Sequence, residues 1–224
     1  MPAELAAPTM GPVTIVVGHP GAIGGALARR LGADSVLLDA AASGNDEAMG
    51  LREAFAAAAA GRGVASVVHA HLPAASLRRR PLGDLDGDDW DELVDGPVRA
   101  LLATLQAARS VLDRGGRIVV VVPSVGVLGE PGLVAACTAA EAARGLAKSA
   151  ARAWGPGGIA VHLVAGAPSA FGSEETGSAD ANVSALADTG ADGVAEAVHA
   201  ALVGLPGSMT GTTLFVDGGR TMLP

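Results

Sequence analysis

The sequence predicts a single α/β domain in which helices cover both faces of a doubly wound parallel sheet. Short runs rich in Val, Ile and Leu alternate along the whole chain with amphipathic, alanine-rich segments. Half of the 224 residues are hydrophobic and 32 are glycine, a composition that suits close packing of helices on a sheet. A chain of this length can bury one sizeable core, and it contains no linker or repeat that would indicate a second domain.

Each element follows from the local pattern. Six apolar runs that end in a turn or a glycine are predicted as strands: 13–19, 35–39, 65–71, 116–124, 158–166 and 212–219. The amphipathic segments between them are predicted as helices: 21–32, 46–63, 88–116 (disturbed at Pro97), 137–155 and 190–204. Strict alternation of the two kinds of element makes the sheet parallel. Residues 1–10 read as a loose tail and 11–224 as the domain.

Charge and composition exclude several classes of protein. The net charge of -8 and the sequence pI of about 5.0 argue against a surface for nucleic acid or for an anionic membrane. Cys137 is the only cysteine, so an intrachain disulfide and a cysteine-based zinc cluster are both excluded, and no metal site is predicted. No apolar run reaches membrane-spanning length, and the first residues carry no basic cluster. We therefore expect a cytoplasmic protein without a membrane segment.

The first predicted strand runs directly into a glycine-rich turn and a helix. Gly18 and Gly24 lie in this turn, and Asp39 ends the second predicted strand. Glycines there let backbone amides and a helix N-terminus approach a pyrophosphate, and a carboxylate at the end of the next strand can bind an adenosine ribose. Because glycine is abundant throughout the chain, a tight turn without a nucleotide explains the pattern equally well.

These stretches, together with later ones, resemble the short-chain dehydrogenase/reductase family almost from end to end. VGHPGAIG is similar to the family's motif TGxxxGxG, with Gly18 and Gly24 in place and Ala22 at the middle glycine. GRIVVVVPSVGVLGEPGL is similar to the family's serine strand and loop, and MTGTTLFVDGGRTM to its closing strand. The resemblance implies a Rossmann-like single domain. Only about thirty residues separate Asp39 from His69, so one strand–helix unit of the usual fold is predicted to be missing.

The family's catalytic residues do not carry over. The family uses a serine, a tyrosine thirteen residues later, a lysine four residues after the tyrosine, and an asparagine in the long helix. In that register Ser124 is retained, whereas Cys137, Glu141 and Pro97 stand at the tyrosine, lysine and asparagine positions. The chain contains no tyrosine, and Glu141 places a negative charge where the family has a cation. The family's own NAD(P)-dependent oxidoreduction is therefore predicted to be lost.

Three functions from different classes remain. The favoured one is a catalytically silent, structural subunit that assembles with itself or with an active relative. The second is a non-redox enzyme (isomerisation, aldol-type or cyclisation chemistry) in which Ser124 or Cys137 acts beside His69 or His71, with Glu141 in acid–base work. The third is a sensor of a nucleotide or metabolite. A structural role is the alternative for each of these residues. Cys137 is then a small buried residue, and Ser124 and the histidines form local hydrogen bonds. The sequence does not indicate a substrate.

The resemblance also bears on cofactors and partners. No NAD(P) binding, or only weak binding, is predicted. Ala22 adds a methyl group where the backbone meets phosphate, and Glu141 removes the cation that holds the ribose. Helices 88–114 and 137–153 are predicted to form a four-helix contact in a homo-oligomer or with an active relative. That expectation rests on a stripe of small apolar residues: Leu101, Leu102, Leu105, Ala108, Ala139, Ala142, Ala143, Leu146 and Ala150.

Overall fold

A computed structural model describes residues 11–39, 47–59, 61–172 and 190–221, so the predicted tail and most of the predicted loop 169–182 lie outside the described residues. The fold is an α/β domain built on one six-stranded parallel sheet in the order β2-β1-β3-β4-β5-β6. Its strands are β1 (Val13–Gly18), β2 (Ser35–Leu38), β3 (Val64–Ala70), β4 (Leu112–Pro123), β5 (Ala160–Gly166) and β6 (Thr213–Val216). The predicted parallel sheet of six strands is confirmed.

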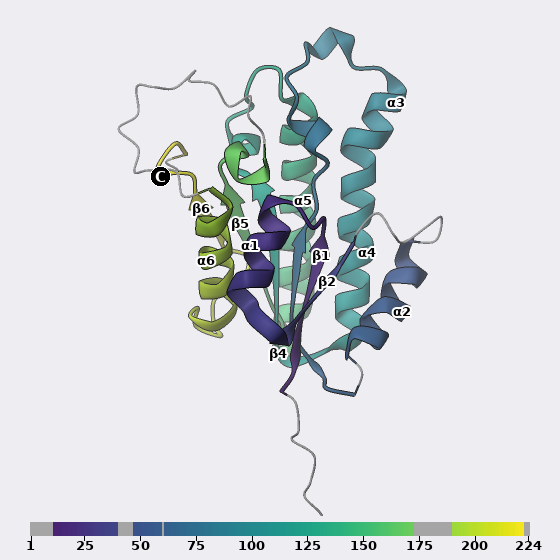
Figure 1. Cartoon of the computed structure of the whole chain (residues 1–224), viewed down its shortest axis with the longest axis vertical. Coiled ribbons are helices and arrows are strands. Elements are labelled where there is room, and N and C mark those ends of the chain that lie inside the picture. The colour runs from purple at the N-terminus through teal and green to yellow at the C-terminus, as the bar shows by residue number, and fades with distance from the viewer. Residues whose placement is uncertain (1–10, 40–46, 60, 173–189, 222–224) are drawn as a thin grey trace, which may run out of the picture.

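Helices cover both faces of this sheet (Figure 1). One face carries α1 (Ala22–Leu31) and α6 (Gly190–Val203), which contact each other. The other face carries α2 (Glu47–Ala59), α4 (Gly96–Val111) and α5 (Val134–Trp154). Between Asp39 and His69 the described residues hold only α2 and most of β3, in agreement with the predicted missing unit.

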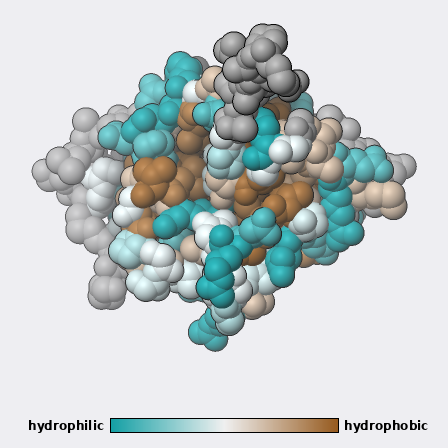
Figure 2. All heavy atoms as spheres, turned by 90° about the horizontal axis from the view of Figure 1, so that it is seen from below, coloured by the Kyte–Doolittle hydropathy of each residue, from teal (hydrophilic) through white to brown (hydrophobic). Residues whose placement is uncertain are grey.

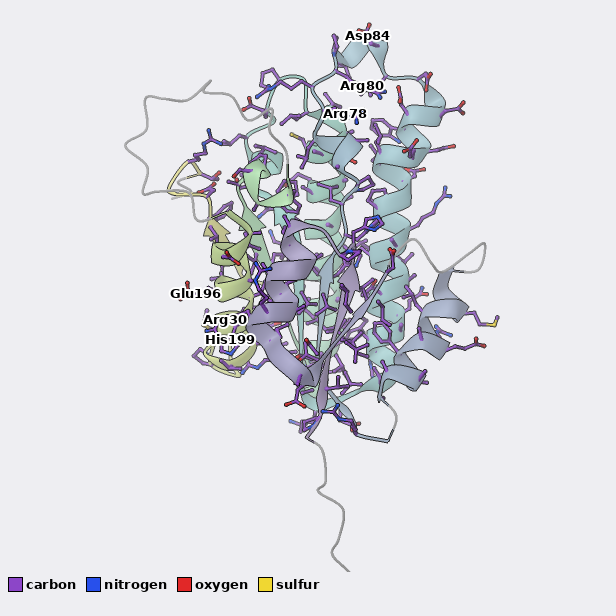
Figure 3. All side chains as sticks on the ribbon, viewed as in Figure 1. Arg30, Arg78, Arg80, Asp84, Glu196 and His199 are labelled. Atoms are coloured by element: carbon purple, nitrogen blue, oxygen red, sulfur yellow. The ribbon has the colours of Figure 1, made fainter. Side chains whose placement is uncertain are left out.

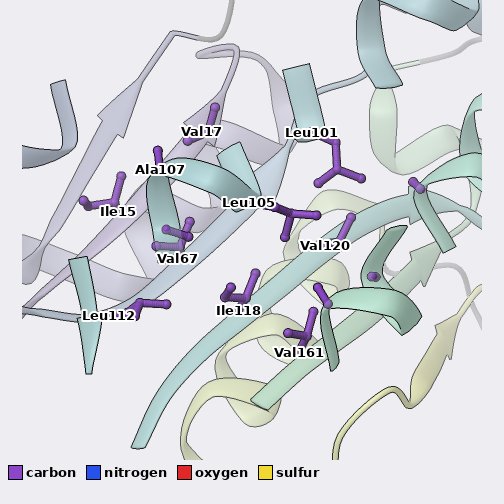
Figure 4. Packing of buried hydrophobic residues seen from close by; sticks show 14 of the residues in the cluster. Ile15, Val17, Val67, Leu101, Leu105, Ala107, Leu112, Ile118, Val120 and Val161 are labelled. Atoms are coloured by element: carbon purple, nitrogen blue, oxygen red, sulfur yellow. The ribbon is translucent and has the colours of Figure 1, made fainter. Parts of the chain in front are cut away.

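Buried strand residues alternate between two apolar layers. Ile15, Val67 and Ile118 pack with Leu101 and Leu105 of α4 in the larger layer (Figure 4). Their neighbours Val16, Val68 and Val119 point to the opposite layer, against α1 and α6. Because both faces of the sheet are covered, the central strands are apolar at nearly every position, which is why they read as continuous Val and Ile runs.

The long predicted helix 88–116 is divided and shorter than expected. A short helix α3 (Gly87–Trp90) leads into a π-helical segment η5 (Asp91–Asp95), and α4 then begins at Gly96. Pro97 has no amide hydrogen to donate and its ring crowds the preceding turn, so the wider turn before it removes the conflict. The helix ends at Val111 because Leu112 already pairs with Val64 in the sheet.

The stripe of small apolar residues on α4 and α5 lies mostly inside the domain. Leu101, Leu105, Ala108, Ala143 and Ala150 are buried in the core of this chain, whereas Leu102 is 43% exposed. Most of the stripe therefore faces the chain's own sheet, and Leu102 with the partly exposed Ala142 and Leu146 is the part left for a partner. The reason is that a helix on a sheet must turn its widest apolar face to that sheet.

The two ends of the sheet differ in what surrounds them. Seen from the end where the strands begin, apolar residues gather in the middle of the surface and polar residues surround them (Figure 2). No helix within the described ranges is both long and apolar enough to cross a membrane. The opposite end, where the parallel strands finish, collects the polar residues that the sequence analysis singled out.

Candidate active site at the carboxyl edge of the sheet

The turn between β1 and α1 depends on two glycines for its shape. A Cβ atom on Gly18 would lie 2.7 Å from the carbonyl oxygen of Ala70, and one on Gly24 would lie 2.1 Å from the carbonyl oxygen of His19. Both contacts are to backbone, so no change of side-chain rotamer could relieve them. Both glycines were predicted as cofactor residues, and both have a structural role. Gly18 allows β1 to lie close to β3, and Gly24 allows the turn at His19 to lie close to α1.

The N-terminus of α1 is open to an anion. Gly21 is its N-cap residue and offers no side chain to its amides, and the first turn contains no acidic residue. A Cβ atom on Gly21 would meet nothing within 4 Å, so the space outside this turn is free. Ala22 is exposed on the first turn. Unsatisfied amides and the positive end of the helix dipole are the usual means of holding a pyrophosphate.

Three adjacent strands, β2, β1 and β3, are followed at this edge by titratable side chains. Nδ1 of His19 lies 3.1 Å from Oδ1 of Asp39. The ring centroid of His19 lies 5.2 Å from that of His71, which in turn lies 6.3 Å from that of His69. The edge therefore carries a row of one carboxylate and three imidazoles beside the open turn of α1. Within the described residues no group of three or more histidine, cysteine or acidic side chains is placed to hold a metal ion.

The hydrogen bonds of these histidines are not the local ones expected. Nδ1 of His69 lies 3.0 Å from Oγ1 of Thr104 on α4. Because Thr104 donates its own hydroxyl proton to the carbonyl of Ala100, its oxygen accepts from His69, and the tautomer is assigned as Nδ1–H. Nδ1 of His71 is buried and has no partner among the described residues.

Burial lowers the pKa of both inner histidines. Desolvation, followed by the nearby His71, lowers the pKa of His69 to about 3. Desolvation also lowers the pKa of His71, with His19 adding to the effect and Asp39 opposing it. Both imidazoles are therefore neutral at pH 7.

We expect the His69→Asn variant to lose less stability in acid than the natural protein. The unfolded chain binds a proton at this position below pH 6.5 while the folded chain remains neutral down to about 3, so stability is present above this window and is lost as the pH falls through it. Between pH 7 and pH 5 this residue alone accounts for about 2 kcal/mol. Urea unfolding of both proteins at the two pH values measures the difference, and equal losses would contradict the expectation.

A second group of predicted residues lies where β4 meets α5. Ser124 begins the short 3₁₀ turn η6 (Ser124–Val127), and this turn packs on α5: a Cβ atom on Gly126 would lie 2.7 Å from Cβ of Ala140. The turn that Ser124 begins therefore lies against the part of α5 that carries Cys137 and Glu141. Ser124 is 1% exposed as a residue, but no hydrogen-bond partner for its hydroxyl occurs in the described part of the chain. The expected bond to local backbone groups is absent there.

Cys137 is a buried thiol, which agrees with its interpretation as a small buried residue and not as a nucleophile. Its Sγ donates to the carbonyl of Val125 at 3.4 Å, and it packs with Leu77, Val125 and Leu133. Burial raises its pKa, and the carboxylates of Glu130 and Glu141 raise it further, although a backbone hydrogen bond opposes this. A thiol that stays protonated is a poor nucleophile, so nucleophilic catalysis by Cys137 is not supported.

Glu141 does not stand as an isolated negative charge. Nε of Arg144 lies 3.1 Å from Oε1 of Glu141, and Nη1 of Arg144 lies 3.1 Å from Oγ1 of Thr213 on β6. Nη2 of Arg144 is buried without a partner among the described residues. The sequence analysis missed this arginine, although its position one turn after Glu141 is a recognisable signal for a helical ion pair.

A small cavity lies beside His69 and His71, between α4, the end of β4 and α5. It measures about 20 Å³, room for about one water molecule, and is lined by His69, His71, Pro97, Pro123 and Ala139, among others. Pro97, which stands at the asparagine position of the family register, contributes an apolar wall and no donor. The edge therefore combines an open anion-binding turn, a carboxylate–imidazole row and the hydroxyl of Ser124, which has no partner in the described part of the chain.

Comparisons with known proteins identify the fold and favour an oxidoreductase. A family model described as enoyl-(acyl carrier protein) reductase matches residues 25–221. Gluconate 5-dehydrogenase of Gluconobacter oxydans is 34% identical over 101 residues, which are 44% of this chain and 39% of that enzyme. The chain thus covers only about two fifths of that curated relative's length.

Two solved structures extend the likeness over nearly the whole chain. A short-chain dehydrogenase from Burkholderia cenocepacia in complex with NADP has a TM-score of 0.74 and 25% identity, covering 94% of this chain and 98% of that one. A blue fluorescent protein from a metagenomic library, in complex with NADPH, has a TM-score of 0.78 at 23% identity, with 96% and 100% covered, and shows likeness of fold.

These findings contradict two predictions. The prediction of a non-catalytic or structural subunit is wrong, because the similar proteins are oxidoreductases by their family model and by the named dehydrogenases. The prediction of absent or weak NAD(P) binding is also wrong, since similar structures hold NADP and NADPH. One physical objection to binding also loses force in the structure, because Arg144 pairs with the carboxylate of Glu141.

Proposed function

The chain belongs to the short-chain dehydrogenase/reductase family, and on that basis we propose that it binds NAD(H) or NADP(H) and transfers hydride between this cofactor and a carbonyl-containing substrate. The observation that carries the proposal is the open N-terminus of α1 beside Asp39. It supplies amides for a pyrophosphate and a carboxylate for a ribose at the same edge of the sheet.

We assign a binding role to the amides of α1, to Asp39 and to Ser124. The amides at the start of α1 bind the pyrophosphate, and Asp39 accepts hydrogen bonds from the adenosine ribose. The hydroxyl of Ser124 donates to the substrate oxygen, which gains negative charge as hydride arrives. The cofactor, when bound, supplies or accepts the hydride.

A proton must balance the hydride, and we propose that water at this edge delivers it. The family's tyrosine, lysine and asparagine positions are held here by Cys137, Glu141 and Pro97, which we propose do not transfer the proton. The thiol of Cys137 donates to the carbonyl of Val125, and the carboxylate of Glu141 is bound to Arg144. Pro97 offers no donor to the cavity that it lines. Reduction of a carbonyl then takes the hydride from the cofactor and the proton from solvent.

We further propose that chains associate through α4 and α5 and that the protein is cytoplasmic. Association through α4 and α5 is supported by the half-exposed Leu102 and by the partly exposed Ala142 and Leu146, although most of the apolar stripe is buried in the chain's own core. Sedimentation measures the mass of the assembly. A cytoplasmic location remains part of the proposal.

Hydride transfer is tested with the purified chain and a reduced cofactor carrying deuterium at the transferable position. We expect deuterium to appear on the product carbon when a panel of ketones, aldehydes and enoyl thioesters is supplied, as read by mass spectrometry. If the chain binds the labelled cofactor but no member of the panel gains deuterium, the oxidoreductase proposal for these substrate classes is wrong and only binding survives.

A further inference from the structure

The carboxylate–imidazole row crosses the part of the edge that would hold the adenosine ribose. Asp39 follows β2, His19 follows β1 and His71 follows β3, and these three strands are neighbours in the sheet. His19 pairs with Asp39 at 3.1 Å, with side-chain exposures of 49% and 44%, so both groups can be reached by a ligand. The ring centroid of His71 lies 5.2 Å from that of His19, and the buried Nδ1 of His71 has no partner among the described residues.

Imidazoles are the cationic groups that this edge can offer to a phosphate on the ribose. The sequence contains no lysine or arginine from residue 40 to residue 51, directly after Asp39. In the first turn of α1 there is no acidic residue, and Arg29 further along α1 is held by Asp192 at 2.8 Å. The contacts that the described residues give His19 with titratable groups are the ion pair with Asp39 and the ring contact with His71.

We propose that protonation of His19 selects between the two dinucleotides, so that the preference for NADPH over NADH rises as the pH falls. When His19 is neutral, the carboxylate of Asp39 accepts a hydrogen bond from the ribose 2′-hydroxyl of NADH and repels the 2′-phosphate of NADPH. When His19 is protonated, its positive charge offsets the negative charge of Asp39. An N–H group of its ring can then donate a hydrogen bond to the 2′-phosphate. This inference rests on the proposed function.

The direction in which the NADPH preference changes with pH shows whether the change comes from the cofactor or from the protein. A phosphate monoester loses negative charge below its second pKa of about 6, and this change alone would weaken NADPH binding in acid. A rise in the preference for NADPH on acidification must then come from the protein. A single proton taken up with the 2′-phosphate changes the ratio of dissociation constants by at most about tenfold per pH unit.

The test is the ratio of the dissociation constants of NADH and NADPH at pH 8, 7 and 6, measured by fluorescence titration. In the natural protein we expect the ratio to rise about tenfold from pH 8 to pH 6, a change appropriate to a half-exposed pair. The His19→Gln variant should show no rise. The Asp39→Asn variant should prefer NADPH at all three pH values, because the opposing carboxylate is gone.

A matched control is available on another helix. His199 lies on α6, near the end of the molecule opposite the edge (Figure 3), and His199→Gln should keep the full pH dependence. A ratio that does not change with pH, or a rise that survives in His19→Gln, would overturn the inference while leaving dinucleotide binding intact. Failure of both dinucleotides to bind at any pH would instead overturn the proposed function.

Discussion

The Gly24→Ala variant is expected to lose about 1–3 kcal/mol of stability and to bind the dinucleotide at least about tenfold more weakly. The added methyl group would lie 2.1 Å from the carbonyl oxygen of His19, so the turn between β1 and α1 must move. That movement displaces both the amides of α1 and the ring of His19. Urea unfolding and NADPH titration measure the two losses.

Gly25→Ala is the matched control for that change. Its Cβ atom would have as its nearest neighbour Nη1 of Arg29 at 3.6 Å, the far end of a flexible side chain. Alanine in a helix is more favourable than glycine by up to about 1 kcal/mol, so this variant should be as stable as the natural protein or slightly more stable. Equal stability of the Gly24→Ala and Gly25→Ala variants would show that the turn tolerates movement and would contradict the role given to Gly24.

The Ser124→Ala variant is expected to reduce kcat/KM by about ten- to a hundredfold with little change in cofactor affinity. The hydroxyl of Ser124 has no partner among the described residues, so it can donate to a substrate oxygen that becomes charged. A hydrogen bond to a charged group contributes about 1.5–3 kcal/mol, and each 1.4 kcal/mol is about a factor of ten in rate.

Ser149 provides the comparison for this variant. It lies on α5 on an exposed surface beside Lys148 and Thr210, away from the turn that Ser124 begins. Ser149→Ala should leave kcat/KM unchanged. If the two serine variants lose activity equally, or neither does, then Ser124 does not bind the substrate oxygen in the way proposed.

The fold was predictable from the sequence because each of its signals is local and repeated. Val16 and its neighbours in β1 are buried on both faces, so the run is apolar throughout and shows where a covered parallel strand lies. The short spacing from Asp39 to His69 leaves room for one helix and no additional strand, and the six-stranded sheet agrees. The division of the long helix before Pro97 was foreseen only as a disturbance, since the geometry that relieves a proline depends on its surroundings.

The register of the sequence names the candidate residues but does not show their interactions. The turn that begins at Ser124 packs on the part of α5 that carries Cys137 and Glu141, and only the folded chain shows which of their charges are paired. Arg144 lies one helical turn beyond Glu141 and binds it, so the negative charge that argued against a cofactor is already neutralised. The meeting of His19 with Asp39 and His71 joins three strand ends that are distant in sequence, and only the parallel sheet places them side by side.

Titration of the purified chain with NADPH and NADH at pH 7, read by isothermal calorimetry, tests most directly whether the carboxyl edge is a dinucleotide site. We expect saturable binding of one molecule per chain with a dissociation constant on the order of micromolar for at least one of the two, as is common for enzyme ligands. Binding should weaken in Gly21→Ala, whose methyl group would enter space that is free in the structure and adjoins the amides of α1. The absence of heat for both cofactors up to millimolar concentration, from a chain that unfolds cooperatively, would contradict the dinucleotide site and the oxidoreductase built on it.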